Sequence, residues 1–162
     1  MACPPFDWRP ARPEDVRALA AIYRDAALRL GPAVYTPVQV RAWASFADDA
    51  PGFRNYVVGH DTWVATLSAG AGPVGFCGVG SHDGVHEVHS LYVAVDHTRC
   101  GIGREMLART LVRAQDAGAT RFAAWVTPFS RPLFLAAGFV QTQAVQAPFA
   151  GAMFERYRVE RG

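Results

Sequence analysis

The feature that most constrains this chain is an apolar segment that runs into a loop with two glycines and then into a helical pattern. The segment is Leu91–Val95, the loop is Arg99–Arg104, and a helix is predicted over Gly103–Ala117. A strand, a glycine loop and a helix in this order point several backbone N–H groups at one place, at the positive end of the helix dipole. Gly101 and Gly103 lack a Cβ, so a ligand can approach the backbone closely. The unit is typical of a phosphate-binding site.

Three phosphate loops compete for this pattern, and a simple tight turn without a ligand is the structural alternative. The Rossmann fingerprint needs a third small residue, where this chain has Met106. The Walker A loop needs a lysine, and this chain has none, because all 16 of its Lys and Arg residues are arginine. The third is the pyrophosphate loop that binds acyl-CoA. The segment resembles motif A of the GNAT superfamily of N-acetyltransferases, [QR]-x-x-G-x-[GA], in which Gly101 and Gly103 match and Thr98 replaces the usual Gln or Arg.

Other segments extend this resemblance over about residues 6–158, in the expected order. They are WRPARPEDVRALAAIYRDA near the N-terminus, YTPVQVRAW at Tyr35–Trp43, PLFLAAGF at Pro132–Phe139 and MFERY at Met153–Tyr157. Together they are similar to a bacterial subgroup of small GNAT enzymes. The resemblance implies an α/β fold with a central, mostly antiparallel mixed sheet, a splayed parallel pair of strands and flanking helices. The length of 162 residues fits one domain over 1–162.

Periodicity and turn residues predict the individual elements. The predicted strands are Phe6–Pro10, Thr62–Ser68, Pro73–Ser81, Val85–Val95, Phe122–Val126, Phe139–Val145 and about Met153–Val159. The predicted helices cover residues 13–30, Pro37 to about Asp48, Gly103–Ala117 and Ser130–Ala137. Residues 50–52 are expected to break the second helix, and residues 69–72 are expected to form a turn. Three glycines in the strand Pro73–Ser81 indicate that other groups pack closely against it.

The resemblance also implies the co-substrate and how it lies. Acetyl-CoA is expected between the two splayed strands, with its pantetheine arm paired to the backbone of Leu91, Tyr92 and Val93 like an added strand. Its pyrophosphate is expected at the loop formed by Arg99, Cys100, Gly101, Ile102, Gly103 and Arg104. An amine would then attack the thioester directly. This reaction needs a base for the amine, an oxyanion donor and an acid for the leaving thiolate.

Two residues of the predicted strand Val85–Val95 are candidates for the base. Glu87 stands at the offset from Gly101 where histone-type members of the superfamily carry their catalytic glutamate. His89 is the second candidate because an imidazole titrates near neutral pH. Strand alternation predicts that Glu87, His89 and Leu91 share one face. The alternatives are a solvated carboxylate at Glu87 and a packed or substrate-lining imidazole at His89.

Two further positions of the resemblance concern the acid and the acceptor. Phe134 stands where the family usually carries a tyrosine acid, and a phenyl ring cannot donate a proton. The thiolate then leaves unassisted, through water or with help from another hydroxyl, for which Tyr92 and Tyr157 are possible substitutes. The first two helices roof the acceptor site in this family. Tyr35, at the loop between them, is predicted to line the acceptor pocket.

Composition limits the partners. The net charge of +2 is too small to indicate nucleic acid or a membrane surface, and no apolar run approaches the length of a membrane span. The histidines around Glu87 are not expected to form a metal site, because His86 and His89 should face opposite sides of a strand. Three cysteines without metal-ligand spacing and an N-terminus without a signal pattern favour the cytoplasm. A homodimer is possible, as dimers are common in this family.

The sequence therefore favours an acetyl-CoA-dependent N-acetyltransferase that acts on an amine of a small molecule or a peptide. Two alternatives stay open. One is an acyl-CoA-binding module without catalysis, which the substitutions at Thr98 and Phe134 suggest. The other is an acyltransferase that uses a different acyl donor or a hydroxyl acceptor.

Overall fold

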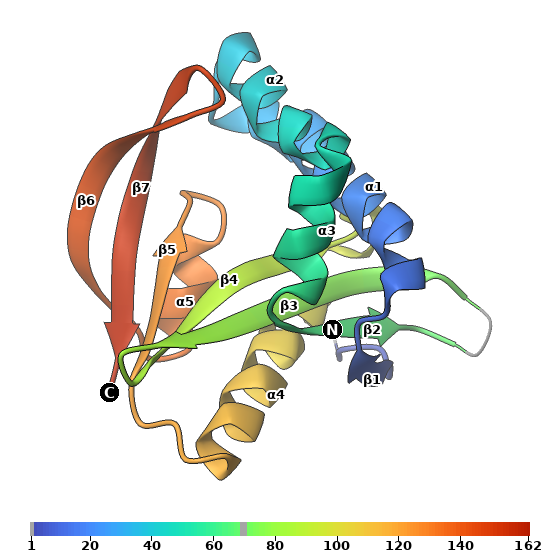
Figure 1. Ribbon diagram of the computed structural model, residues 1–162, viewed down its shortest axis with the longest axis vertical. Coiled ribbons are helices and arrows are strands. Elements are labelled where there is room, and N and C mark those ends of the chain that lie inside the picture. The colour runs from blue at the N-terminus through green and yellow to red at the C-terminus, as the bar shows by residue number, and fades with distance from the viewer. Residues whose placement is uncertain (1, 69–70) are drawn as a thin grey trace.

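The computed structural model describes residues 2–68 and 71–162, and its core is one seven-stranded sheet with helices on both faces (Figure 1). The strands are β1 (Asp7–Pro10), β2 (Asp61–Thr66), β3 (Pro73–His82), β4 (Val85–Val93), β5 (Phe122–Val126), β6 (Val140–Phe149) and β7 (Ala152–Arg161). The helices are α1 (Val16–Leu30), α2 (Pro37–Ser45), α3 (Ala50–Val58), α4 (Ile102–Asp116) and α5 (Arg131–Ala136).

The strand order is β1-β2-β3-β4-β5-β7-β6, and β4 and β5 form the parallel pair. The other neighbouring strands are antiparallel. The β4–β5 pairing runs from His86↔Phe122 to Val88↔Ala124, although β4 continues to Val93 and β5 to Val126. The two strands therefore part after their first residues. The expected mixed sheet with a splayed parallel pair is confirmed.

Each face of the sheet carries its own core. Met106 and Leu107 of α4 pack with Phe122 and Phe134 in one buried cluster, on the side of α4 and α5. A second buried cluster, on the side of α1 and α3, includes Tyr23, whose ring packs against those of Phe53 and Tyr92. The expected helices around α1, α2, α4 and α5 are confirmed, and these elements fix the two walls of the space between β4 and β5.

The surroundings of two glycines in β3 show why this strand has no side chains at those positions. A Cβ on Gly78 would lie 2.8 Å from Ser90 Oγ, and a Cβ on Gly80 would lie 2.7 Å from His89 Nε2. No side chain fits at these positions without moving its neighbours. The prediction that other groups pack closely against this strand is confirmed, and these groups come from both neighbouring strands, Ser90 and His89 on β4 and Thr62 on β2.

The second helix ends before residues 50–52, as expected, but these residues begin a further helix that the sequence does not predict. The carboxylate of Asp49 accepts a hydrogen bond from Gly52 N at 3.1 Å and caps α3, which begins at Ala50. Pro51 lies in the first turn, where its missing N–H has no intrahelical partner to lose. A turn signal thus marks the start of an additional helix.

Other boundaries differ by a few residues. The predicted strand Val85–Val95 ends at Val93, and a 3₁₀ turn over Val95–His97 leads into the glycine loop. The hairpin of β6 and β7 is longer than predicted at both strands. Of the turn predicted at residues 69–72, positions 69–70 lie outside the described residues.

Candidate active site

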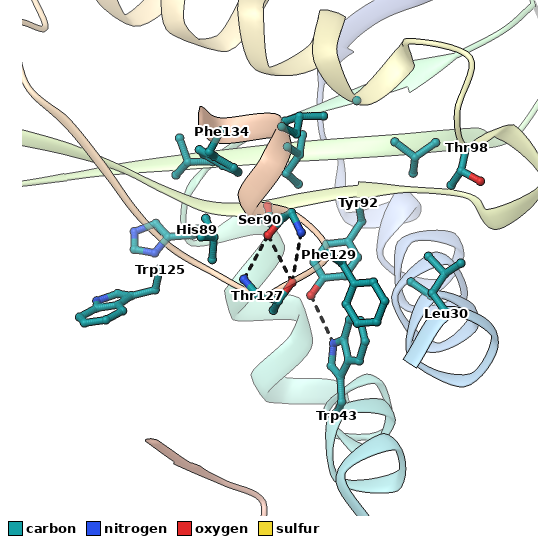
Figure 2. A pocket seen from close by; sticks show the side chains of 18 residues that line it. Leu30, Trp43, His89, Ser90, Tyr92, Thr98, Trp125, Thr127, Phe129 and Phe134 are labelled. Carbon is teal, nitrogen blue, oxygen red and sulfur yellow. Dashed lines mark hydrogen bonds between the residues drawn. The ribbon is translucent and has the colours of Figure 1, made fainter. Parts of the chain in front are cut away.

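A cleft of about 230 Å³ opens where β4 and β5 part (Figure 2). It is walled by β4, β5 and α5, by the start of α4 and by residues of α1 and α2. The lining residues are Ala26, Leu30, Trp43, Val88, His89, Ser90, Leu91, Tyr92, Val93, Thr98, Gly103, Trp125, Val126, Thr127, Phe129, Ser130, Leu133 and Phe134.

The glycine loop stands at one end of this cleft. Gly101 precedes α4 with a φ of +88°, and Arg99 has a φ of +61°. The first N–H groups of α4 have no partner inside the helix. A Cβ on Gly103 would lie 3.4 Å from Val93 and 3.5 Å from Leu133, so a methyl group fits there and a larger side chain would project into the cleft. The loop can therefore receive an anionic group on its backbone.

The loop's side chains divide into two kinds. Arg99 and Arg104 are exposed, and the ion pairs found among the described residues do not involve them. Cys100 donates its thiol hydrogen to the carbonyl of His97 at 2.8 Å, and Ile102 is buried in the α4 core. The two arginines are thus available to a ligand's charge, while Cys100 and Ile102 offer their backbone.

Leu91, Tyr92 and Val93 all line the cleft, as the sequence predicts. Pairing with β5 stops at Val88, so the edge of β4 beyond it faces the cleft. The Tyr92 side chain points away, toward α1 and α2, where its hydroxyl accepts a hydrogen bond from Trp43 Nε1 at 3.4 Å (Figure 2). Burial raises the pKa of Tyr92 to about 12. This tyrosine is therefore anchored in the wall.

A β-bulge in β4 changes the faces that simple alternation predicts. On either side of the bulge the pairs across to β3 are Gly78–Ser90 and Val79–Val88. His89 is the extra residue, and a bulge of this kind re-aims side chains. Leu91 packs with Val88 on the α4 side, whereas His89 lies beside Gly80 and His60 on the α3 side. The expectation that Leu91 shares a face with Glu87 and His89 is wrong.

Glu87 lies outside the residues that line the cleft. One of its carboxylate oxygens accepts a hydrogen bond from Arg158 Nη1 at 3.1 Å, and the Arg158 side chain is 16% exposed. The same guanidinium lies over the Trp125 ring at 5.5 Å. Glu87 thus holds β4 to β7 through a largely buried arginine. Its carboxylate is engaged in structure rather than open to the cleft.

His89 does line the cleft. Its imidazole stacks on that of His60, with ring centroids 4.2 Å apart and planes inclined by 38°. Partial burial is the main cause that lowers the pKa of His89, and the nearby His60 lowers it further, whereas the charge of Glu87 raises it. A lowered pKa keeps the imidazole neutral and able to accept a proton at neutral pH.

The wall opposite β4 carries hydroxyl groups beside Phe134. Phe134 is 2% exposed and packs edge-on against Phe139, with the ring centroids 5.1 Å apart. Thr127 and Ser130 cap each other: each backbone N–H donates to the other's hydroxyl, at 3.2 and 3.3 Å, and the two hydroxyl oxygens are 3.3 Å apart. Only one hydroxyl hydrogen can serve that last bond. The second is available to a ligand in the cleft.

Tyr35 lies one layer behind the cleft wall. Trp43 and Phe129 line the cleft with their rings stacked at 5.9 Å, and Tyr35 packs edge-on against both. Tyr35 is buried, and burial raises its pKa to about 12. Tyr35 does not itself line this cleft but supports two aromatic residues that do.

Several residues of the site escape sequence reasoning. They are His60, Trp125, Phe129, Thr127, Ser130 and Arg158. Each lies on an element or turn other than β4, which carries His89, or meets His89 because of the bulge that the sequence does not reveal. The capping pattern of Thr127 and Ser130 before Pro132 is the one local signal that could have been used.

The described residues contain no cluster of three or more His, Cys, Asp or Glu side chains that could hold a metal ion. His86 packs near Phe122 on the α4 side, opposite to His89, as expected. In the part of the chain that the structure describes, no helix has the length and apolarity needed to span a membrane.

A cleft between splayed parallel strands, with a glycine loop at the start of the following helix, is the arrangement that the sequence resemblance implies. The family model for the acetyltransferase (GNAT) family matches residues 17–139. The chain belongs to the GNAT acetyltransferase family. No curated protein matches the chain significantly.

Solved structures show the same fold over nearly the whole chain. A GCN5-related N-acetyltransferase from Rhodopseudomonas palustris, whose name also reads "Aminotransferase, Class-II", is 27% identical with a TM-score of 0.90, covering 99% of this chain and 98% of its own. Two others were solved with acetyl-CoA. The putative acetyltransferase yncA from Salmonella typhimurium is 20% identical, with a TM-score of 0.68 and coverage of 97% and 93%. A phosphinothricin acetyltransferase from Sinorhizobium meliloti is 21% identical, with a TM-score of 0.71 and coverage of 96% and 87%.

Proposed function

We propose that this protein transfers the acetyl group of acetyl-CoA to a primary amine of a small molecule or a peptide, by direct attack. The observation that carries the proposal is that one cleft joins the glycine loop before α4 to the neutral imidazole of His89. Acetyl-CoA, when bound, supplies the thioester. The residues of the chain bind it, orient the amine and move the proton.

The cofactor end fits coenzyme A in three respects. Gly103 leaves room in the cleft beside the first N–H groups of α4, and Gly101 adopts the positive φ with which the loop enters the helix. Arg99 and Arg104 add positive charge beside them. The edge of β4 at Leu91–Val93 offers backbone groups to an extended arm. The complexes of related structures with acetyl-CoA support this assignment.

His89 is the better of the two bases that the sequence suggests. It lines the cleft, and its lowered pKa leaves it neutral at pH 7. Glu87 is ion-paired to Arg158 and lies outside the cleft lining. We therefore assign proton removal from the amine to His89, and to Glu87 a supporting charge beside it.

The hydroxyl pair Thr127–Ser130 takes the place of the missing phenol at Phe134. Both oxygens accept a backbone N–H, which polarises the hydroxyls and strengthens them as donors. Ser130 precedes Phe134 by one helical turn, on the same helix face. The spare hydroxyl hydrogen would stabilise the departing thiolate. The wall formed by Trp43 and Phe129 would hold the apolar part of the acceptor.

We place the protein in the cytoplasm, as a single domain that can form a homodimer. The three cysteines, Cys3, Cys77 and Cys100, are free thiols, which is consistent with a reducing compartment.

The test is the release of free CoA thiol from acetyl-CoA in the presence of a panel of amines and amino-terminal peptides. The proposal predicts release that depends on the amine and that gives the acetylated amine in mass spectrometry. Binding of acetyl-CoA without release by any amine would favour the non-catalytic module. Release with alcohols, or only with longer acyl groups, would favour the other alternative.

A further inference from the structure

His89 belongs to two hollows at once. It lines the cleft described above, and it also lines a second hollow together with His60, Asp61, Ser81, His82 and Glu87. His89 is the one residue that the two linings share. A proton taken up in the cleft can therefore leave on the other side of the same imidazole.

We propose that His60 positions the His89 imidazole, and that the second hollow is the exit through which the proton of the acceptor amine reaches solvent. This inference rests on the proposed function. In the step itself, the attacking amine loses a proton to the neutral His89, which becomes an imidazolium. The imidazolium then gives this proton to a water molecule in the second hollow and returns to its neutral form.

The orientation of His60 is set by α3. Its Nδ1 lies 3.0 Å from the carbonyl oxygen of Tyr56. A carbonyl oxygen can only accept, so Nδ1 carries the hydrogen, and neutral His60 has a free acceptor at Nε2. The Tyr56 hydroxyl donates to the carbonyl of His89 at 3.0 Å. One turn of α3 thus fixes both the stacking partner and the backbone of the bulged residue.

Gly80 of β3 makes room for the pair. A Cβ at this position would lie 2.7 Å from His89 Nε2 and 3.2 Å from His60 Cδ2. Its neighbours are ring atoms of two packed imidazoles, so neither can move aside without breaking the stack. The bulge in β4, the glycine in β3 and the end of α3 therefore define one arrangement of the two rings.

The charges around the pair favour release of the proton. Two imidazoles with centroids 4.2 Å apart repel each other when both are charged. Glu87 faces His89 from β4, but its charge is shared with Arg158 of β7. Of the other titratable groups near the hollow, Asp61 pairs with Arg113, His82 with Asp83, and Tyr56 keeps its proton because burial raises its pKa. No acceptor found among the described residues is hydrogen-bonded to the His89 ring, although the charge of Glu87 favours its protonated form.

The first arm of the test is an NMR titration of the His89 imidazole in the parent and in His60→Gln. Glutamine keeps a donor for the Tyr56 carbonyl but carries no charge. We expect the pKa of His89 to rise in the variant, and the acid limb of kcat/KM to move to higher pH with it. An unchanged titration of His89 would overturn the role of His60. This readout does not depend on turnover, so it stands apart from a failure of the proposed function.

The second arm compares Gly80→Ala with Gly72→Ala, where an added Cβ would meet nothing within 4 Å. Gly80→Ala should lower kcat by about ten- to a hundredfold, because small displacements of a reacting group are costly. Its thermal shift with acetyl-CoA should match that of the parent, which shows that the fold and the cofactor end are intact. If Gly80→Ala is as active as Gly72→Ala, the positioning role is wrong.

Discussion

The two ends of the cleft are built in different ways. The end proposed to bind the cofactor is made of backbone: the free edge of β4, the loop at Gly101 and Gly103, and the first turn of α4. The end proposed to bind the acceptor is made of side chains, with His89 on β4, His60 after α3 and the aromatic pair Trp43 and Phe129. A backbone site needs small residues at fixed spacing. A side-chain site needs several elements to meet.

This difference predicts how substitutions at each end would affect binding and turnover. Coenzyme A presents the same groups to every enzyme that uses it, so a loop of N–H groups is sufficient. In the proposed function the acceptor is recognised by the rings and hydroxyls that surround His89. Changes at the cofactor end should therefore remove all binding, and changes at the acceptor end should alter turnover while acetyl-CoA still binds.

The largest effect on acetyl-CoA binding is expected at Gly103. Replacing Gly103 by Trp fills the start of the cleft, because even a Cβ there already contacts Val93 and Leu133. We expect acetyl-CoA binding, measured by calorimetry, to weaken by at least about a hundredfold, or about 2.7 kcal/mol. Gly103→Ala is the matched control and should bind nearly as the parent does. Retained binding in Gly103→Trp would show that the ligand lies elsewhere.

The second effect is expected on kcat, at the proposed base His89. His89→Gln should lower kcat by about a hundredfold to ten-thousandfold, the range for loss of general base catalysis, without a change in acetyl-CoA binding. The parent's kcat/KM should rise with pH as His89 loses its proton, and because the pKa of His89 is lowered, this rise should lie on the acidic side of an ordinary histidine. Steady-state rates across pH check both points.

Glu87→Gln is the comparison that ranks the two bases. It removes half of the ion pair with Arg158 and leaves that guanidinium largely buried. We expect a smaller loss of kcat than in His89→Gln, together with a lower thermal stability. A larger loss of kcat in Glu87→Gln, with the fold intact, would return the role of base to the glutamate.

A third effect, of about tenfold, is expected at the hydroxyl pair. Ser130→Ala and Thr127→Val each remove one of the two mutually capped hydroxyls. The kcat should fall while the KM for both substrates changes little, since a leaving thiolate forms only as the reaction proceeds. The double variant should lose less than the product of the single losses, because the hydroxyls act as one unit. Independent, multiplicative losses would mean that they are merely structural.

The smallest effect on turnover is expected far from the cleft, at Asp15. Its carboxylate accepts two hydrogen bonds from Arg9, at 2.8 and 2.9 Å, and one from Arg12 N, and the bonds from Arg9 are the main reason why its pKa is lowered. Asp15→Asn should cost about 2 kcal/mol at pH 7, or about 4–8 °C in Tm, with kcat unchanged.

The pH dependence of this loss follows from the lowered pKa. A carboxylate whose pKa is lower in the folded state contributes its full stability above its unfolded pKa, and this contribution is lost as the pH falls through the folded value. Urea unfolding of the parent and Asp15→Asn should therefore converge toward acid pH. A constant difference at all pH values would show that the loss comes from packing.

The sequence was sufficient for the glycine loop between β4 and α4 and for the order of the predicted elements. The spacing of Gly101 and Gly103 after an apolar strand predicts the loop because only a few backbone arrangements satisfy it. The same reasoning failed at His89, since period-two alternation does not reveal a bulge. It failed at Pro51 because proline is compatible both with a turn and with the first turn of a helix.

The acceptor end could not be predicted for a related reason. His60 follows a helix that the turn signal at residues 50–52 concealed, so its stacking on His89 has no trace in the sequence. Tyr35 was predicted to line the pocket, but Trp43 and Phe129 lie in front of it. Which of several aromatic rings lies in front depends on the packing of α2 against the β6–β7 hairpin, where Gln39 Nε2 donates to the carbonyl of Met153.

Thermal unfolding with and without acetyl-CoA tests the central claim most directly, with free CoA and ATP as controls. A ligand at about 100 times its Kd adds about 2.7 kcal/mol to the stability, which for a domain of this size raises Tm by roughly 5–10 °C. We predict such a shift with acetyl-CoA and CoA, and none with ATP. No shift at millimolar acetyl-CoA would mean that the glycine loop is only a turn, and the transferase assignment would then be wrong for this chain.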